Sequence, residues 1–222
     1  MMENNSELAF ILDRSGSMAG LESDTIGGFN AFLEKQKAMP GEARLTTVLF
    51  DHRDCLLHDR MDIRAVQPLT EKEYTVGGST ALLDAVGHAI EKIENAQAYT
   101  AEAYRAGKVL FVITTDGLEN ASREYTLSQV RAMIERQKKD RGWEFLFLGA
   151  NIDAVETAGS LGIAPDRAEN FLSDGDGVAR SFRAVSAAAA CLRETGAMDA
   201  GWGAEVREDF LQRGGRARKR NI

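Results

Sequence analysis

Short runs of consecutive apolar residues recur along the chain. Three of them, residues 8–12, 109–113 and 145–148, hold four or five apolar residues in succession, many of them branched or aromatic. Such runs are typical of β-strands that are buried on both faces of a parallel sheet. Residues 45–50 form a further strand-like segment, and residues 55–58 follow after a short polar gap. The gap is too short for a crossover helix, so these two segments are predicted to form an antiparallel hairpin.

Between the runs, apolar residues recur every three or four positions, the period of a helix that buries one face. This pattern covers residues 26–33, 82–93, 130–134 and 178–192. Strands that alternate with helices predict an α/β fold. We therefore expect a three-layer, Rossmann-like, doubly wound and mostly parallel sheet with one antiparallel edge strand.

Composition narrows the classes of protein that fit this pattern. The chain has 222 residues, of which 44% are hydrophobic and 27% charged, as is ordinary for a globular domain. No apolar run approaches the roughly 18–20 residues that span a bilayer. The acidic start lacks the basic residues and apolar stretch of a secretory signal. The only two cysteines, Cys55 and Cys191, are too few for a disulfide framework. These features predict a cytoplasmic protein without a membrane partner.

Charge is distributed unevenly and suggests a division of the chain. The net charge is −7, but the last ten residues carry five basic side chains and no acid. Residues 1–212 thus hold 22 basic and 34 acidic residues, a net charge of −12. Such an acidic body does not suit a nucleic-acid binder, although the basic tail allows a weak contact. We expect one domain over residues 1–195 and a C-terminal extension over 196–222, with a disordered basic tail.

Oxygen-bearing side chains gather where the predicted strands end. Residues 13–17, Asp-Arg-Ser-Gly-Ser, follow the first strand, and Asp116-Gly117 follows the strand at 109–113. Gly-Gly-Ser-Thr at 77–80 precedes a predicted helix. In a doubly wound sheet, ligands bind beyond the carboxyl ends of the strands, where the three segments would meet. The candidate site residues are Asp13, Ser15, Ser17, Thr80 and Asp116.

This set contains no sulfur and no imidazole, so it favours a hard cation: Mg²⁺ or Mn²⁺, with Ca²⁺ a weaker candidate. The alternation of Asp13, Ser15 and Ser17 lets every second side chain point at one centre, with Gly16 expected to let the backbone turn. Because Mg²⁺ usually keeps several waters, a coordination position would stay open for an outside ligand.

The same residues resemble those of the von Willebrand factor type A (vWA) domain, found in many intracellular bacterial proteins. Residues 10–18, Phe-Ile-Leu-Asp-Arg-Ser-Gly-Ser-Met, are similar to the opening signature of that family, and residues 113–117 to its fourth-strand signature. The resemblance covers roughly residues 5–195. It implies a complete metal-ion-dependent adhesion site (MIDAS), formed by Asp13, Ser15, Ser17, Thr80 and Asp116.

The resemblance also implies roles. Ser15 and Ser17 would bind the ion through their hydroxyls, Thr80 directly or through water, and Asp13 and Asp116 mainly through water. An Asp or Glu from a partner protein would complete the shell. The expected function is therefore that of a metal-dependent protein–protein interaction module, not an enzyme.

Two other interpretations of these residues are open. The first is a magnesium-dependent phosphoryl-transfer hydrolase with Asp13 as nucleophile. Haloacid-dehalogenase-type enzymes, however, carry a second acid where this chain has Ser15, and Lys108 precedes its strand and would lie at the wrong edge of the sheet. No phosphate-binding loop with its lysine is present, and no His or Glu adjoins the motif. The second is purely structural, with hydroxyls capping helices and aspartates binding backbone amides.

Overall fold

The core of the fold is a single twisted sheet. The computed structural model describes residues 5–215, and within them the chain forms six strands. They are β1 (Asn5–Asp13), β2 (Glu42–Phe50), β3 (Asp54–Asp62), β4 (Lys108–Thr115), β5 (Glu144–Gly149) and β6 (Ala168–Asn170). Their order is β3-β2-β1-β4-β5-β6, and all neighbours are parallel except β2 and β3. The predicted fold class is confirmed, with its antiparallel edge strand.

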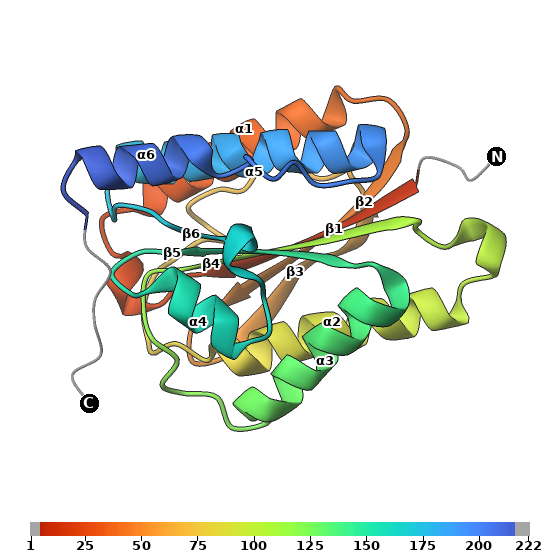
Figure 1. Cartoon of the computed structure of the whole chain (residues 1–222), viewed down its shortest axis with the longest axis horizontal. Coiled ribbons are helices and arrows are strands. Elements are labelled where there is room, and N and C mark those ends of the chain that lie inside the picture. Colours follow the sequence, from red (N-terminus) through yellow and green to blue (C-terminus); the bar gives the residue numbers. More distant parts are fainter. Residues whose placement is uncertain (1–4, 216–222) are drawn as a thin grey trace.

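Helices cover both faces of the sheet (Figure 1). On one face lie α1 (Glu22–Lys37), α5 (Gly175–Thr195) and α6 (Ala204–Gln212). On the other lie α2 (Leu82–Tyr99), α3 (Leu127–Arg141) and the short α4 (Ala154–Ser160). Single 3₁₀ turns occur at Gly16–Met18, Glu102–Tyr104 and Pro165–Arg167. None of the helices in the described part of the chain is long and apolar enough to cross a lipid bilayer.

The apolar run of β1 faces both helical layers. Leu8, Phe10 and Leu12 belong to the core beneath α1 and α5, whereas Ala9 and Ile11 belong to the core beneath α2 and α3. Each of these side chains is buried. Because successive side chains in a strand point to opposite faces, a strand covered on both sides must be apolar at every position. The unbroken apolar run therefore predicted a central strand.

Local sequence signals set several helix boundaries. Thr126 forms a capping box with Gln129 at the start of α3. Asp153 accepts a hydrogen bond from the backbone amide of Glu156 and caps α4. At the end of α3, Gly142 takes a left-handed conformation with φ 64°, which a glycine adopts without steric cost. These caps satisfy backbone groups that the helix itself leaves unpaired.

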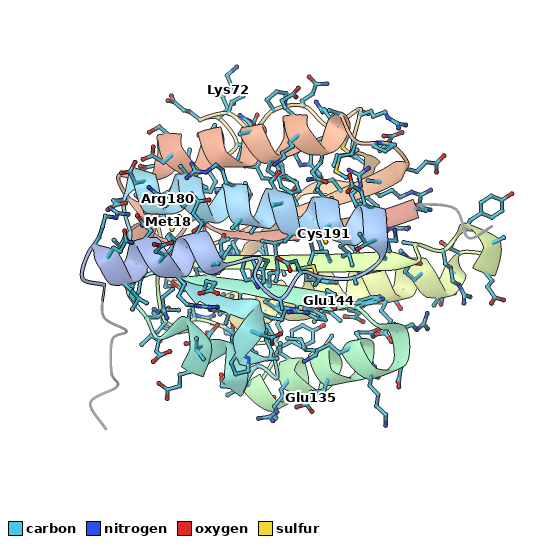
Figure 2. All side chains as sticks on the ribbon, turned by 45° about the horizontal axis from the view of Figure 1, so that its top comes forward. Met18, Lys72, Glu135, Glu144, Arg180 and Cys191 are labelled. Atoms are coloured by element: carbon cyan, nitrogen blue, oxygen red, sulfur yellow. The ribbon has the colours of Figure 1, made fainter. Side chains whose placement is uncertain are left out.

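The segment after residue 195 contains an element that the sequence pattern did not predict. Helix α6 lies beside α5 (Figure 2). Arg180 of α5 forms ion pairs with Glu205 and Asp209 of α6. Trp202 is buried, and its indole N–H donates to the backbone carbonyl of Asp166. The extension thus packs on the sheet domain as far as residue 215, and the predicted basic tail at 216–222 lies outside the described residues.

Candidate metal centre

The two central strands bring their carboxyl ends to the same edge of the sheet. β1 and β4 are parallel neighbours, and Leu12 pairs in register with Thr114. Asp13 is the last residue of β1, and Asp116 follows directly after β4. The adjacency predicted for these strands is therefore confirmed, and it places the two carboxyl-bearing residues side by side at the edge where doubly wound sheets bind ligands.

The carboxylate of Asp13 is fully buried and held by the protein. Its Oδ1 accepts the backbone N–H of Ser15 at 2.7 Å, and its Oδ2 accepts the hydroxyl of Thr115 at 2.6 Å. The hydroxyl of Tyr74 donates to the backbone carbonyl of Asp13. Burial raises the pKa of Asp13, and the hydrogen bonds from Thr115 and Ser15 act against that rise. These contacts fix the orientation of the carboxylate.

Three hydroxyls meet next to this carboxylate. Ser15 Oγ lies 3.0 Å from Ser17 Oγ. A β-carbon placed on Gly117 would lie 3.3 Å from both Ser17 Oγ and Thr80 Oγ1, so these two hydroxyls converge on the backbone that follows Asp116. The structure thus brings Ser15, Ser17 and Thr80 together from two loops.

Asp116, unlike Asp13, has no hydrogen bond of normal geometry to its carboxylate within residues 5–215. Its side chain is buried, with 2% of the residue exposed, and neither carboxylate oxygen forms a hydrogen bond within residues 5–215. Burial raises its pKa, and the charge of Asp13 adds to the rise, while the nearby hydroxyls of Ser17 and Ser173 act to lower it. A buried carboxylate without a partner is costly, and a bound cation is one of the few groups that can offset this cost.

The loop at 77–81 is tied to both strand ends. The Gly16 amide donates to the carbonyl of Gly78, and Thr80 exchanges two hydrogen bonds with Asn120 at 2.9 and 3.0 Å. Gly78 has φ +75°, and a β-carbon there would lie 2.7 Å from the His52 ring. The turn therefore needs glycine at Gly78. It does not need it at Gly16, where φ is not positive, which corrects the expectation from the sequence.

The donor set fits a hard divalent cation. It combines two buried carboxylates with three hydroxyls. In the described part of the chain, no group of three or more His, Cys, Asp or Glu side chains could hold a metal, so a site here depends on the hydroxyls. Oxygen-only sets of this kind suit Mg²⁺ and Mn²⁺. If the two carboxylates act through water, the directly bound hydroxyls are neutral, and the ion would keep enough charge to attract a further anionic ligand.

The purely structural interpretation accounts for only part of this geometry. Ser15 precedes the 3₁₀ turn without a side-chain cap, and the cap position of α2 is Ala81 rather than Thr80. Asp13 does bind a backbone amide, as that interpretation expects. Asp116 binds none within residues 5–215. The unbonded carboxylate therefore favours a ligand over a scaffold role.

Two cations close in sequence to the candidate residues, Lys108 and Arg14, are engaged by other groups. Lys108 begins β4, so it lies at the opposite end of the strand from Thr115, and its ammonium donates to the backbone carbonyl of Arg193. The guanidinium of Arg14 lies 3.1 Å from the carboxylate of Asp51. Neither residue offers the centre a cation for a transferred phosphate.

His88 of α2 provides a pH-dependent contact with two acidic residues. Its two ring nitrogens lie 3.0 Å from Asp54 and 3.1 Å from Glu124. Burial lowers the pKa of His88, but the hydrogen bonds and charges of Asp54 and Glu124 more than offset this, so its pKa is raised. The contribution of these contacts to the stability of the fold is then fully present below the ordinary histidine pKa of about 6.5. It is lost as the pH rises through the higher pKa of the folded state.

We therefore expect His88→Gln to reduce the free energy of unfolding at pH 5.5 more than at pH 8.5. Chemical denaturation of both proteins across this range measures the difference. His52→Gln, which removes a more exposed imidazole, is the control for the substitution itself. A loss that is the same at both pH values would contradict the protonated ion pair.

Comparisons with known proteins were made on sequence and on structure. No protein-family model and no curated protein matches the chain. Among solved structures, proximal thread matrix protein 1 (PTMP1) from the mussel byssus, with a zinc-occupied MIDAS motif, matches with a TM-score of 0.57 and 15% identity over 86% of this chain. A von Willebrand factor type A protein from Catenulispora acidiphila matches with a TM-score of 0.58 and 16% identity over 84% of this chain.

A third structure, the D319A mutant of the PilB minor pilin from Streptococcus sanguinis, matches with a TM-score of 0.53 and 10% identity over 87% of this chain. The matches cover 47%, 42% and 63% of those three proteins, so this chain spans about half the length of PTMP1. At these identities the likeness concerns the fold. Together with the sheet order and the single antiparallel edge strand, it shows that the chain has the fold of a von Willebrand factor type A domain.

Proposed function

We propose that this chain is a divalent-metal-dependent protein-binding module. The ion would be Mg²⁺ or Mn²⁺, held through the hydroxyls of Ser15, Ser17 and Thr80, with Asp13 and Asp116 acting mainly through water. The observation that carries the proposal is the buried carboxylate of Asp116, which has no hydrogen-bond partner within residues 5–215 and lies beside these hydroxyls. PTMP1, which shares the fold at low identity, has been solved with a zinc-occupied MIDAS motif.

The partner would be a protein that offers an Asp or Glu to the ion. Hydroxyl ligands carry no charge, so the cation would keep enough positive charge to attract an incoming carboxylate. The protein's own residues would hold the ion and position the incoming group, while the ion would supply the attraction. Among described residues, neither Lys108 nor Arg14 is placed to assist phosphate chemistry, and we propose binding rather than catalysis. A cytoplasmic setting remains part of this proposal.

Thermal unfolding with and without Mg²⁺ tests the metal site. A ligand that binds only the folded state stabilises it by about 2.7 kcal/mol at one hundred times its Kd. We expect the wild-type protein to gain this stability and the double variant Ser15→Ala/Ser17→Ala to gain almost none. Removing both hydroxyls takes away both members of the Ser15–Ser17 hydrogen bond, and Asp13 keeps its bonds from the Ser15 amide and Thr115, so the metal-free variant should keep its fold.

The control is Ser128→Ala, which removes an exposed hydroxyl at the start of α3, away from the centre. It should respond to Mg²⁺ as the wild type does. If neither Mg²⁺ nor Mn²⁺ stabilised the wild-type protein, or if the double serine variant responded equally, the proposed metal site would be wrong.

A further inference from the structure

A polar cleft with a volume of about 580 Å³ lies beside the candidate metal centre. It is bordered by the β2–β3 turn, the loop before α2 and the loop before α3. Ser79, next to Thr80, and Asn120, which binds the backbone of Thr80, form part of its wall. A ligand bound at the metal centre would therefore extend over this cleft.

The acidic groups of the cleft are already engaged by the protein. Asp84 accepts hydrogen bonds from three successive backbone amides, at residues 123–125, over 2.7 to 2.9 Å. Burial raises its pKa, but these amides more than offset that effect, so the pKa is lowered and the carboxylate stays charged. Asp54 and Glu124 both bind His88. The hydrogen-bonding capacity of these carboxylates is thus largely used.

The two arginines of the cleft have unused hydrogen-bonding capacity within residues 5–215. Arg53 and Arg123 are exposed and line the cleft from opposite loops. Within residues 5–215, neither guanidinium forms a hydrogen bond or an ion pair, whereas Arg14 and Arg60, for example, are paired with acids. The groups of the cleft that can still form hydrogen bonds are therefore mainly donors, and donors suit an anionic ligand.

The walls of the cleft are held in place before any ligand binds. Glu119 accepts hydrogen bonds from the amides of Ala121, Ser122 and Leu83 and from the hydroxyl of Ser122. This carboxylate joins the loop that carries Arg123 to the first turn of α2. A rigid wall lowers the entropy that is lost when a ligand binds, and Arg123 extends from such a wall.

We propose that this cleft binds a second carboxylate of the partner, so that the module recognises an acidic segment with two carboxyl groups. One would reach the metal ion and the other Arg53 and Arg123. This rests on the proposed function, because the first carboxylate is bound by the ion. Guanidinium groups bind carboxylates through two parallel hydrogen bonds. In a body with a net charge of −12 over residues 1–212, such donors also reduce the repulsion that an acidic partner would meet.

Selection from a random peptide library tests the proposal on the full chain, immobilised in Mg²⁺. Binders that are lost in chelator should carry two acidic residues at a constant spacing. Synthetic peptides of that sequence, with both acids or with either one changed to its amide, are then titrated against the wild type and the Arg53→Gln/Arg123→Gln variant. The control, Lys35→Gln/Arg141→Gln, removes the same charge from exposed positions on α1 and α3.

We expect the arginine variant to bind the two-acid peptide about tenfold or more weakly than the wild type does, since a charged hydrogen bond contributes about 1.5–3 kcal/mol. Its affinity for the peptide that keeps only the metal-binding acid, and its stabilisation by Mg²⁺, should match the wild type. Unchanged affinity for the two-acid peptide, or selected peptides with one acid only, would overturn this inference and leave the metal site intact. Wild-type protein without any Mg²⁺-dependent binder would overturn the proposed function as well.

Discussion

Asp116→Ala is expected to raise the stability of the metal-free protein and to abolish its response to Mg²⁺. Most substitutions of a buried residue destabilise a protein. Here the side chain is a buried carboxylate without a hydrogen-bond partner within residues 5–215, and the Asp13 charge lies close to it. Removing a buried, unpaired polar group recovers its desolvation penalty, about 1–3 kcal/mol. The wild type would regain this energy only when a cation is bound.

Asp13→Ala is the matched comparison, since it removes a neighbouring carboxylate with the opposite expected sign. The Asp13 carboxylate accepts the Ser15 amide and the Thr115 hydroxyl. Its loss would leave the Ser15 amide unpaired in a buried setting and the Thr115 hydroxyl with only its longer hydrogen bond to the Gly117 carbonyl. The free energy of unfolding, measured with denaturant in the presence of chelator, should be higher for Asp116→Ala than for the wild type and lower for Asp13→Ala. If Asp116→Ala were destabilised as much as Asp13→Ala, Asp116 would have a structural role, and the purely structural interpretation would be favoured.

The central strands were predictable because burial on both faces requires an apolar residue at nearly every position. The runs at 8–12, 109–113 and 145–148 lie in β1, β4 and β5. The edge strand β6 has no such apolar run, because it has only three residues and its middle residue is Glu169. That acid is buried because Arg207 of α6 pairs with it across 38 positions of sequence. A pattern read over neighbouring residues does not contain a pairing of this kind.

The same limit applies to the candidate centre. The five oxygen-bearing residues were found because each stands where a strand ends or a helix is about to begin, and the topology brings such positions together. The residues that hold them in place were missed. Thr115 adjoins Asp116 in sequence and could have been suspected, but Tyr74 and Asn120 reach the centre from loops without a local signature. Whether the five residues bind a metal stays a prediction that the experiments above address.

Arg60→Ala is expected to destabilise the protein by about 3–5 kcal/mol, because it leaves a buried charge without its partner. Glu7 of β1 is completely buried, and Arg60 of the edge strand β3 reaches across β2 to bind both of its carboxylate oxygens at 2.9–3.1 Å. Burial raises the pKa of Glu7, and the hydrogen bond and charge of Arg60 act to lower it. Without Arg60, the acid must stay charged with only a long hydrogen bond from Gln97, at 3.4 Å, or take up a proton, and both are costly.

The double variant Glu7→Gln/Arg60→Ala separates this effect from other consequences of the substitution. Arg60 has φ +46°, but alanine keeps the β-carbon, so the backbone strain is the same in both proteins. Removing the charge of Glu7 should restore most of the stability that Arg60→Ala loses, measured as the denaturation midpoint. Lys92→Ala breaks an exposed pair with Asp59 and should cost less than about 1 kcal/mol. If the double variant were no more stable than Arg60→Ala alone, the loss would come from the packing of the arginine side chain rather than from the stranded charge.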